Sequence, residues 1–118
     1  MTGTPRVAIF GPSPMLSVTV EPLTAAGGDD IHVHAAGQGV WVARMAAELG
    51  AEAVLCGFCG GESGTVLRRL LEQLPIELHL VETSEGSGAY IHDRRDGERR
   101  PVAQSAAMPA SRHEIDDL

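Results

Sequence analysis

The strongest constraint on the fold is an alternation of helix-like and strand-like segments through the middle of the chain. Residues 40–49 and 64–74 carry apolar side chains at three- and four-residue spacing, which predicts two amphipathic helices. Residues 53–58, an apolar run bounded by glycines, and residues 77–81 predict strands, and residues 7–10 predict a buried first strand. Such an order is typical of an α/β fold with a parallel sheet and right-handed crossovers.

Two further pairs of segments do not fit a buried parallel sheet. Residues 16–20 and 31–34 alternate apolar and polar side chains around a Gly/Asp-rich turn, which predicts a hairpin with one exposed face. Residues 88–92 and 101–104 flank a charged segment with an Asp-Gly turn signal, which predicts a second hairpin. We interpret the two hairpins as a flap that is separate from the central sheet.

The length and the end of the sequence favour one domain that continues beyond what is present. A chain of 118 residues fits a single domain. Its hydrophobic content of 43% allows a core, and its aromatic content of 3% means that Ala, Val, Leu and Ile must build it. Ser111 and Glu114 form a capping box, which predicts a helix start close to the last residue. That pattern is typical of a truncated domain.

Charge and composition argue against several kinds of partner. The formal net charge is −7, and all nine basic residues are arginine, with no basic stripe. We therefore expect neither a nucleic-acid partner nor an anionic membrane surface as a partner. No apolar run approaches the roughly 20 residues of a membrane span, and the N-terminus lacks a signal-peptide pattern. Two cysteines make no disulfide framework, so we expect a cytoplasmic location.

Two groups of metal-ligating side chains have competing interpretations. Cys56 and Cys59 form a C-x-x-C pattern that could be a redox pair or half a zinc site. Because Cys56 falls inside an apolar strand, we favour buried core thiols. His32 and His34 share one face of a strand and could ligate a metal ion. Two histidines without a carboxylate partner make a weak site, so we favour a solvated face there.

Nucleotide- and phosphate-binding patterns are weak. Gly37-x-Gly39 could begin a dinucleotide fingerprint, but Val42 stands at the third glycine position. The absence of lysine excludes a P-loop. Arg99 or Arg100, in the charged hairpin turn, could contact a phosphate, although a solvated turn is the simpler interpretation.

Two glycine motifs resemble those of the ribokinase-like (PfkB) carbohydrate kinases. Residues 36–44, Ala-Gly-Gln-Gly-Val-Trp-Val-Ala-Arg, resemble the family signature Gly-Gly-Lys-Gly-x-Asn-x-Ala, and residues 57–64 resemble its Gly-x-x-Gly-x-Asp-x-Gly turn. The resemblance covers nearly the whole chain and is greatest for the hexose-phosphate, 1-phosphofructokinase-like branch. It implies the N-terminal part of a three-layer αβα fold, a single domain over residues 1–118. Residues about 15–35 and 87–105 would form a β-strand lid over the sugar site.

The same resemblance implies a set of substrate-binding residues. Gly37, Gln38, Gly39, Trp41 and Ser17 would line the acceptor pocket, beside the N-terminus of the helix that begins near Gly39. The two glycines would permit positive φ and let the backbone approach a polyhydroxy ligand. Gln38 stands where the signature has Lys, and Trp41 stands where it has Asn. Ser17 aligns with an early Asp that binds sugar hydroxyls in the family. These changes suggest a different substrate or a decayed pocket. Trp41 could stack on a sugar face or a ring, which favours a bulkier or less charged ligand, or it could equally be a core or interface residue.

The resemblance also predicts what this chain does not contain. The second family signature, Asp-Thr-x-Gly-Ala-Gly-Asp, has no match, so we expect no catalytic residue, no metal ligand and no kinase activity in this chain alone. The full-length family uses ATP and Mg²⁺. The function implied is therefore the substrate-binding and lid portion of an ATP-dependent carbohydrate kinase homologue, which transfers a phosphoryl group to a sugar hydroxyl. The alternative is a non-catalytic module that binds a small ligand or forms a homodimer through the lid strands.

Overall fold

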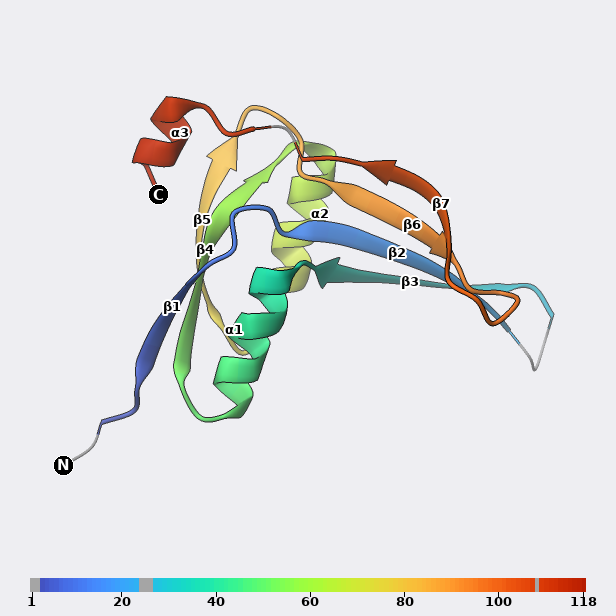
Figure 1. Ribbon diagram of the computed structural model, residues 1–118, viewed down its shortest axis with the longest axis horizontal. Helices are drawn as coiled ribbons and strands as arrows, with labels where there is room; N and C mark the ends of the chain where they lie inside the picture. Colours follow the sequence, from blue (N-terminus) through green and yellow to red (C-terminus); the bar gives the residue numbers. More distant parts are fainter. Residues whose placement is uncertain (1–2, 24–26, 108) are drawn as a thin grey trace.

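The computed structural model describes residues 3–23, 27–107 and 109–118 and contains the expected alternation of elements (Figure 1). In chain order the elements are β1 (Arg6–Phe10), β2 (Met15–Pro22), β3 (Asp29–Ala36), α1 (Gln38–Glu48), β4 (Glu52–Gly60), α2 (Gly61–Leu71), β5 (Glu77–Thr83), β6 (Ala89–Asp93), β7 (Arg100–Ser105) and α3 (Arg112–Asp116). None of the helices in these ranges has the length and hydrophobicity needed to cross a bilayer.

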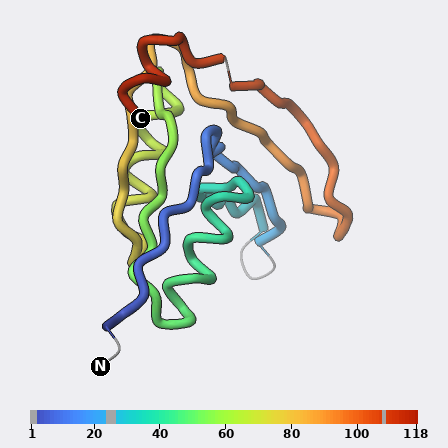
Figure 2. Tube along the Cα trace, turned by 60° about the vertical axis from the view of Figure 1, so that its left-hand side comes forward, coloured from blue at the N-terminus to red at the C-terminus, as the bar shows by residue number. Residues whose placement is uncertain are grey.

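The strands form two separate sheets. A three-stranded parallel sheet has the order β1-β4-β5, and a four-stranded sheet has the order β3-β2-β6-β7. The second sheet consists of two antiparallel hairpins, β2–β3 and β6–β7, that are joined by parallel pairing of β2 with β6. Figures 1 and 2 show this sheet extending away from the three-stranded sheet and its helices. The predicted α/β fold with a parallel central sheet and a separate pair of hairpins is therefore confirmed.

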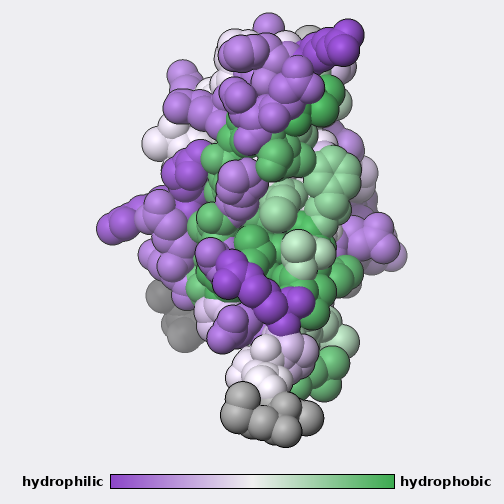
Figure 3. Space-filling view, turned by 90° about the vertical axis from the view of Figure 1, so that its left-hand side faces the viewer, coloured by the Kyte–Doolittle hydropathy of each residue, from purple (hydrophilic) through white to green (hydrophobic). Residues whose placement is uncertain are grey.

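The hydrophobic core lies on one face of the parallel sheet. Alternate side chains of β4 pack there against both α1 and α2, and the buried core residues are Ile9, Val40, Ala43, Ala53, Leu55, Cys59, Leu67 and Leu71. Two successive right-handed crossovers in the order β1-β4-β5 place both helices on the same face. Other apolar residues are exposed at the surface, where they gather along the middle of the side that carries β1 and β5 (Figure 3).

The prediction of a buried first strand is wrong in its burial. Residues 6–10 do form β1, but only Ile9 is buried, whereas Val7 is 39% and Phe10 is 65% exposed. Among the residues that the structure describes, β1 pairs with β4 alone and is therefore an edge strand. The two helices pack on the face of the sheet on which Ile9 lies, whereas Phe10 projects from the opposite face.

The predicted helices exist, with shifted boundaries. α1 begins at Gln38, directly after Gly37, and α2 begins at Gly61, three residues earlier than predicted. The predicted capping box at the chain end is present. The Ser111 hydroxyl accepts a hydrogen bond from the Glu114 backbone N–H, and the Glu114 carboxylate accepts from the backbone N–H groups of Ser111 and Ser84. The last of these bonds ties α3 to the end of β5.

Candidate functional site

The turn between β3 and α1 is shaped by Gly37. Its φ of 121° lies in a region that residues with a Cβ rarely adopt, so the predicted positive φ is confirmed at this position. Gly37 caps α1 without a side-chain hydrogen bond, and its carbonyl accepts the first helical bond, from the Trp41 N–H at 3.2 Å. The N–H groups of the first helical turn have no intrahelical acceptor and are available to other partners.

Gly39 lies in close contact with Gly11, and the positive φ predicted for it is wrong. Its φ is not positive, and a Cβ there would lie 2.6 Å from the Cα of Gly11. A Cβ at Gly11 would in turn lie 2.9 Å from the Cα of Gly39. The two glycines therefore allow the start of α1 to touch the turn that follows β1. This packing requires glycine at position 39, and the approach of Gly39 to a ligand stays a prediction.

One face of the four-stranded sheet carries a row of polar and aromatic side chains. In the sheet register, Ser17 of β2 lies between His34 of β3 and Tyr90 of β6, and Thr19 lies between His32 and His92. Because side chains alternate across a strand, these residues project from the same face. Ser17 and Thr19 are only 2% and 8% exposed.

This face and the start of α1 enclose a groove of about 710 Å³, which we call the sheet–helix groove. Its lining residues come from β2, β3, α1, β6 and the turn after β6: Ser17, Thr19, His34, Ala35, Ala36, Trp41, Arg44, Tyr90, His92, Arg94 and Arg99. A neighbouring hollow shares Trp41, Tyr90, His92 and Arg99 with it and adds Gly37, Gln38 and Gln104. The two form one continuous surface.

The predicted site residues are divided between two sides of the β3–α1 turn. Ser17 and Trp41 line the sheet–helix groove, and Gly37 and Gln38 line its extension. Gly39 instead faces a separate cavity of about 350 Å³ beside the end of β1, which Gly37 and Gln38 also reach. Four of the five predicted residues are therefore brought together, and Gly39 is not among them.

The groove is positively charged although the chain is acidic. Its charged lining residues are Arg44, Arg94 and Arg99, and none of its lining residues is a carboxylate. The Arg44 guanidinium lies 5.8 Å from the ring centroid of Trp41, and that of Arg99 lies 5.9 Å from the ring of Tyr90. Both distances fall within the range of cation–π contacts. This arrangement favours a ligand that carries negative charge.

The contact with Arg99 determines which ring nitrogen of His92 carries the proton when the imidazole is neutral. Its Nδ1 accepts a hydrogen bond of 2.8 Å from the Nε–H of Arg99, which places the imidazole proton on Nε2. Partial desolvation, followed by the positive charges of Arg99 and Arg94, lowers the pKa of His92. The ring of Tyr90 lies 4.5 Å from that of His92, centroid to centroid. His92 can therefore donate a hydrogen bond from Nε2 to a ligand oxygen.

Sequence reasoning missed most of this cationic and aromatic lining. Tyr90, His92, Arg44 and Arg94 were not predicted as site residues, although Tyr90 and His92 belong to the hairpin predicted at residues 88–92. Arg99, one of the two arginines considered as a phosphate contact, lines the groove. Arg100 does not line it, and its guanidinium is paired with Asp96 at 2.6 Å and Glu98 at 3.5 Å.

The groove contains hydroxyl, amide, aromatic and cationic groups that suit a small polar molecule. It does not suit Mg²⁺, which takes carboxylate and phosphate oxygens, because no carboxylate lines it. The residues present therefore fit the binding of an acceptor, and they do not fit the ATP–Mg²⁺ complex.

The two cysteines lie outside the groove. Both thiols are free, and Cys59 belongs to the core cluster. Burial raises the pKa of the Cys59 thiol, against the smaller opposing effects of Arg68 and Ser87. A buried thiol with a raised pKa is a poor nucleophile, so the interpretation of a core thiol is supported for Cys59. Cys56 is only partly buried and does not belong to the core cluster, so the prediction of a buried thiol is wrong there.

Comparison with known proteins gives a family match and a fold match. A family model described as "pfkB family carbohydrate kinase" matches residues 16–115. None of the curated proteins compared with the chain matches it. Among solved structures, phosphofructokinase-2 from Escherichia coli in complex with fructose-6-phosphate matches with a TM-score of 0.76 at 22% identity. That match covers 96% of this chain and 39% of the enzyme.

Other solved structures agree with this fold. The tetrameric inhibited form of the same Escherichia coli enzyme matches with a TM-score of 0.76 at 22% identity, over 96% of this chain and 39% of that one. A carbohydrate kinase from Agrobacterium tumefaciens matches with a TM-score of 0.66 at 18% identity, over 89% of this chain and 36% of that one. The chain therefore spans well under half the length of the kinases whose fold it shares.

Proposed function

Because the chain belongs to the pfkB family of carbohydrate kinases, we propose that it forms the substrate-binding and lid portion of an ATP-dependent carbohydrate kinase. The observation that carries this proposal is the sheet–helix groove. It brings Ser17 of β2 and Trp41 of α1 against Tyr90 of β6, three segments that are far apart in the sequence. Gln38 extends the same surface at the start of α1.

In this proposal the four-stranded sheet is the lid, formed by residues about 15–35 and 87–105. It covers the acceptor from one side while the first turn of α1 supplies N–H donors from the other. A sheet in that position excludes water from the phosphoryl acceptor and so suppresses hydrolysis of the phosphoryl donor. Ser17 and Gln38 would then hydrogen-bond the acceptor hydroxyls, and Trp41 would pack on its face.

The acceptor that fits best is a sugar or related polyhydroxy molecule with an anionic group. Arg44, Arg94 and Arg99 supply positive charge to the groove, and of these Arg94 is approached at 4.0 Å by Glu21, which lies outside the groove. Arginine binds phosphate through charge-assisted hydrogen bonds that are stronger than neutral ones. Trp41 at the position of the signature Asn removes one amide contact to hydroxyls, so we expect charge and stacking to contribute a larger share of the binding.

A binding experiment on the chain itself tests this proposal. Trp41 is the single tryptophan and lines the groove, so its fluorescence reports on ligands there directly. We expect fructose 6-phosphate and other sugar phosphates to quench or shift this signal at lower concentration than the matching neutral sugars. Arg99→Ala should weaken sugar-phosphate binding roughly 10-fold or more, the effect of one charge-assisted hydrogen bond. Arg112→Ala, on α3 outside the groove, is the matched control.

Two binding results would refute the assignment of the groove as the acceptor site. Equal affinity for a sugar and its phosphate would remove the argument from the three arginines. An unchanged Trp41 signal with every sugar, sugar phosphate and nucleoside in a panel would show that the groove is not an acceptor site.

Phosphoryl transfer is proposed only for a protein that also supplies the nucleotide site. ATP, Mg²⁺ and the catalytic base need groups that the groove lacks. We expect no sugar-dependent ATP turnover by these 118 residues alone in a coupled assay, and turnover above background would contradict this division of roles. A Gly-Ala-Gly-Asp segment in the downstream reading frame would support it. The cytoplasmic location expected from the sequence belongs to the same proposal.

A second candidate function is a homodimer through the four-stranded sheet. The face opposite the groove carries Val18, Val20, Ile31, Val33 and Ile91, of which Ile31 is 64% and Val33 is 42% exposed. An exposed apolar sheet face of this kind is a common site of association, and a second copy of the chain offers a matching apolar surface. Escherichia coli phosphofructokinase-2, which shares the fold, has a tetrameric form.

Light scattering after gel filtration tests this second candidate. We expect a dimer for the wild type and a monomer for the double variant Ile31→Glu/Val33→Glu. Leu49→Glu, at the far end of α1 where Leu49 is 84% exposed, is the control that should remain dimeric. A wild-type monomer at high protein concentration would exclude the dimer.

A further inference from the structure

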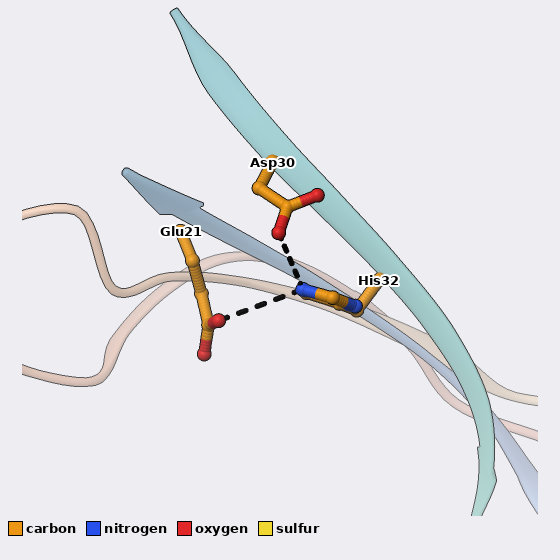
Figure 4. A group of neighbouring side chains, drawn as sticks. All are labelled: Glu21, Asp30 and His32. Carbon is orange, nitrogen blue, oxygen red and sulfur yellow. Dashed lines mark hydrogen bonds and ion pairs between the residues drawn. The ribbon is translucent and has the colours of Figure 1, made fainter. Parts of the chain in front are cut away.

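Three potential metal ligands meet at the far end of the four-stranded sheet. Glu21 of β2 and Asp30 of β3 are cross-strand partners, and His32 lies two residues after Asp30 on the same face. Figure 4 shows the imidazole edge of His32 turned toward both carboxylates. The group lies at the opposite end of the β2–β3 hairpin from α1, and none of its members lines the sheet–helix groove.

The spacing of the ligand atoms fits a small divalent ion. His32 Nε2 lies 2.8 Å from Asp30 Oδ2 and 3.6 Å from Glu21 Oε2, and the three ligand atoms all lie within 4.8 Å of one another. A tetrahedral zinc ion with ligands at about 2.0–2.1 Å separates neighbouring ligand atoms by about 3.4 Å. The two measured distances lie on either side of that value, so small side-chain rotations are enough to admit the ion.

The arginines around the group leave carboxylate oxygens that can still bind a cation. Two nearby acids, Asp29 and Asp93, are already paired with Arg95. Arg94 approaches only the other oxygen of Glu21, Oε1, at 4.0 Å, and so leaves Oε2 directed at His32. Asp30 has His32 as its ion-pair partner and no arginine within pairing distance among the residues that the structure describes.

The sequence had suggested a weaker site in the same place. His32 was paired there with His34, and the pair was set aside because it had no carboxylate partner. The hairpin register instead brings two carboxylates to His32, whereas His34 lines the groove. Imidazole nitrogen and carboxylate oxygen are both zinc ligands, and water could take the fourth position of a tetrahedral ion. The side chains are 39–47% exposed, so water can reach that position.

We propose that Glu21, Asp30 and His32 bind a divalent transition metal ion of the zinc class. The ion would tie β2 to β3 beside the segment that connects them and so fix the outer end of the four-stranded sheet. None of the three residues lines the sugar pocket proposed above, although Arg94 of the groove approaches Glu21 at 4.0 Å.

Isothermal titration of the protein with Zn²⁺ tests the site, after any bound metal has been removed by a chelator. We expect one equivalent to bind and the melting temperature to rise on binding. Co²⁺ as a spectroscopic probe should give the intense visible bands of four-coordinate cobalt. His32→Ala should weaken Zn²⁺ binding at least ~10-fold, and Glu21→Gln combined with Asp30→Asn should do the same.

Matched controls separate this site from other zinc ligands in the chain. His34→Ala, two residues along the same strand, and His113→Ala on α3 should leave the Zn²⁺ affinity unchanged. Circular dichroism checks that each variant is folded. No stoichiometric binding by the wild type, or binding that His32→Ala leaves unchanged, would overturn the proposal. The three side chains would then form only an ion pair.

Discussion

The contact between Gly39 and Gly11 predicts that a larger residue at position 39 destabilises the fold. Gly39→Ala places a methyl carbon 2.6 Å from the Cα of Gly11, whereas carbon atoms in contact ordinarily lie about 3.5–4.0 Å apart. Both atoms belong to backbone or are fixed to it, so no side-chain rotation relieves the overlap. The start of α1 must move by roughly 1 Å, and it carries Gln38 and Trp41 with it.

Two opposing effects determine how much Gly39→Ala changes the free energy of unfolding. Replacing a helical glycine by alanine ordinarily stabilises a helix by about 0.5–1 kcal/mol. Overpacking a close contact costs about 1–3 kcal/mol. We therefore expect Gly39→Ala to lower the free energy of unfolding by about 1–2 kcal/mol. For a domain of this size the melting temperature would fall by roughly 4–8 °C.

Thermal unfolding followed by circular dichroism measures this effect. Gly86→Ala is the control, since its Cβ would meet only the Ser63 hydroxyl oxygen at 4.0 Å and its φ is not positive. We expect that variant to melt within about 2 °C of the wild type, as surface substitutions usually do. Gly11→Ala should also be destabilising, because its Cβ would meet the Cα of Gly39 at 2.9 Å and Leu55 Cδ1 at 3.0 Å.

A Gly39→Ala variant that melts at or above the wild-type temperature would refute the reasoning. It would mean that α1 can move away from the β1 turn at no cost. The glycine would then have to be explained by approach to a ligand, as the sequence had suggested.

Two predictions concern ionisation in the four-stranded sheet. Arg99→Ala should raise the pKa of His92, because it removes a hydrogen bond to Nδ1 and a nearby positive charge; an NMR titration measures this, and an unchanged pKa would contradict the contact. The hydrogen bonds from Arg95 lower the pKa of Asp93 to about 2, below its ordinary 3.8. Ionised Asp93 therefore stabilises the fold above about pH 4, and this contribution is lost as the pH falls toward 2. Asp93→Asn should flatten that part of the dependence of melting temperature on pH, and parallel curves for variant and wild type would argue against it.

The elements and their class could be predicted because local patterns determine them. Alternation at residues 16–20 and 31–34 was enough to identify the first hairpin, and helical spacing identified α1 and α2. The family resemblance placed Ser17 and Trp41 near one another. In each case the information lay within a few neighbouring residues or in a motif.

The parts of the fold and of the site that could not be predicted depend on contacts between elements far apart in the sequence. The parallel pairing of β2 with β6 decides that Tyr90 and His92 face the same groove as Ser17, and no local signal determines that pairing. The exposure of β1 depends on strand order, which puts it at an edge. The approach of Glu21 to His32 depends on hairpin register, which alternation within one strand does not reveal.

The parallel pairing of β2 with β6 has a consequence for the order of folding. These two strands meet only after the chain has passed through α1, β4, α2 and β5. Closing so long a connection costs conformational entropy, so the β2–β6 contact forms slowly. It stabilises the chain only after the intervening elements have packed. We expect the joined sheet to assemble last and to open first in mild denaturant, with amide exchange in β6 faster than in β4. The ligand groove would therefore be a late product of folding, one that a nascent chain lacks until its second hairpin has left the ribosome.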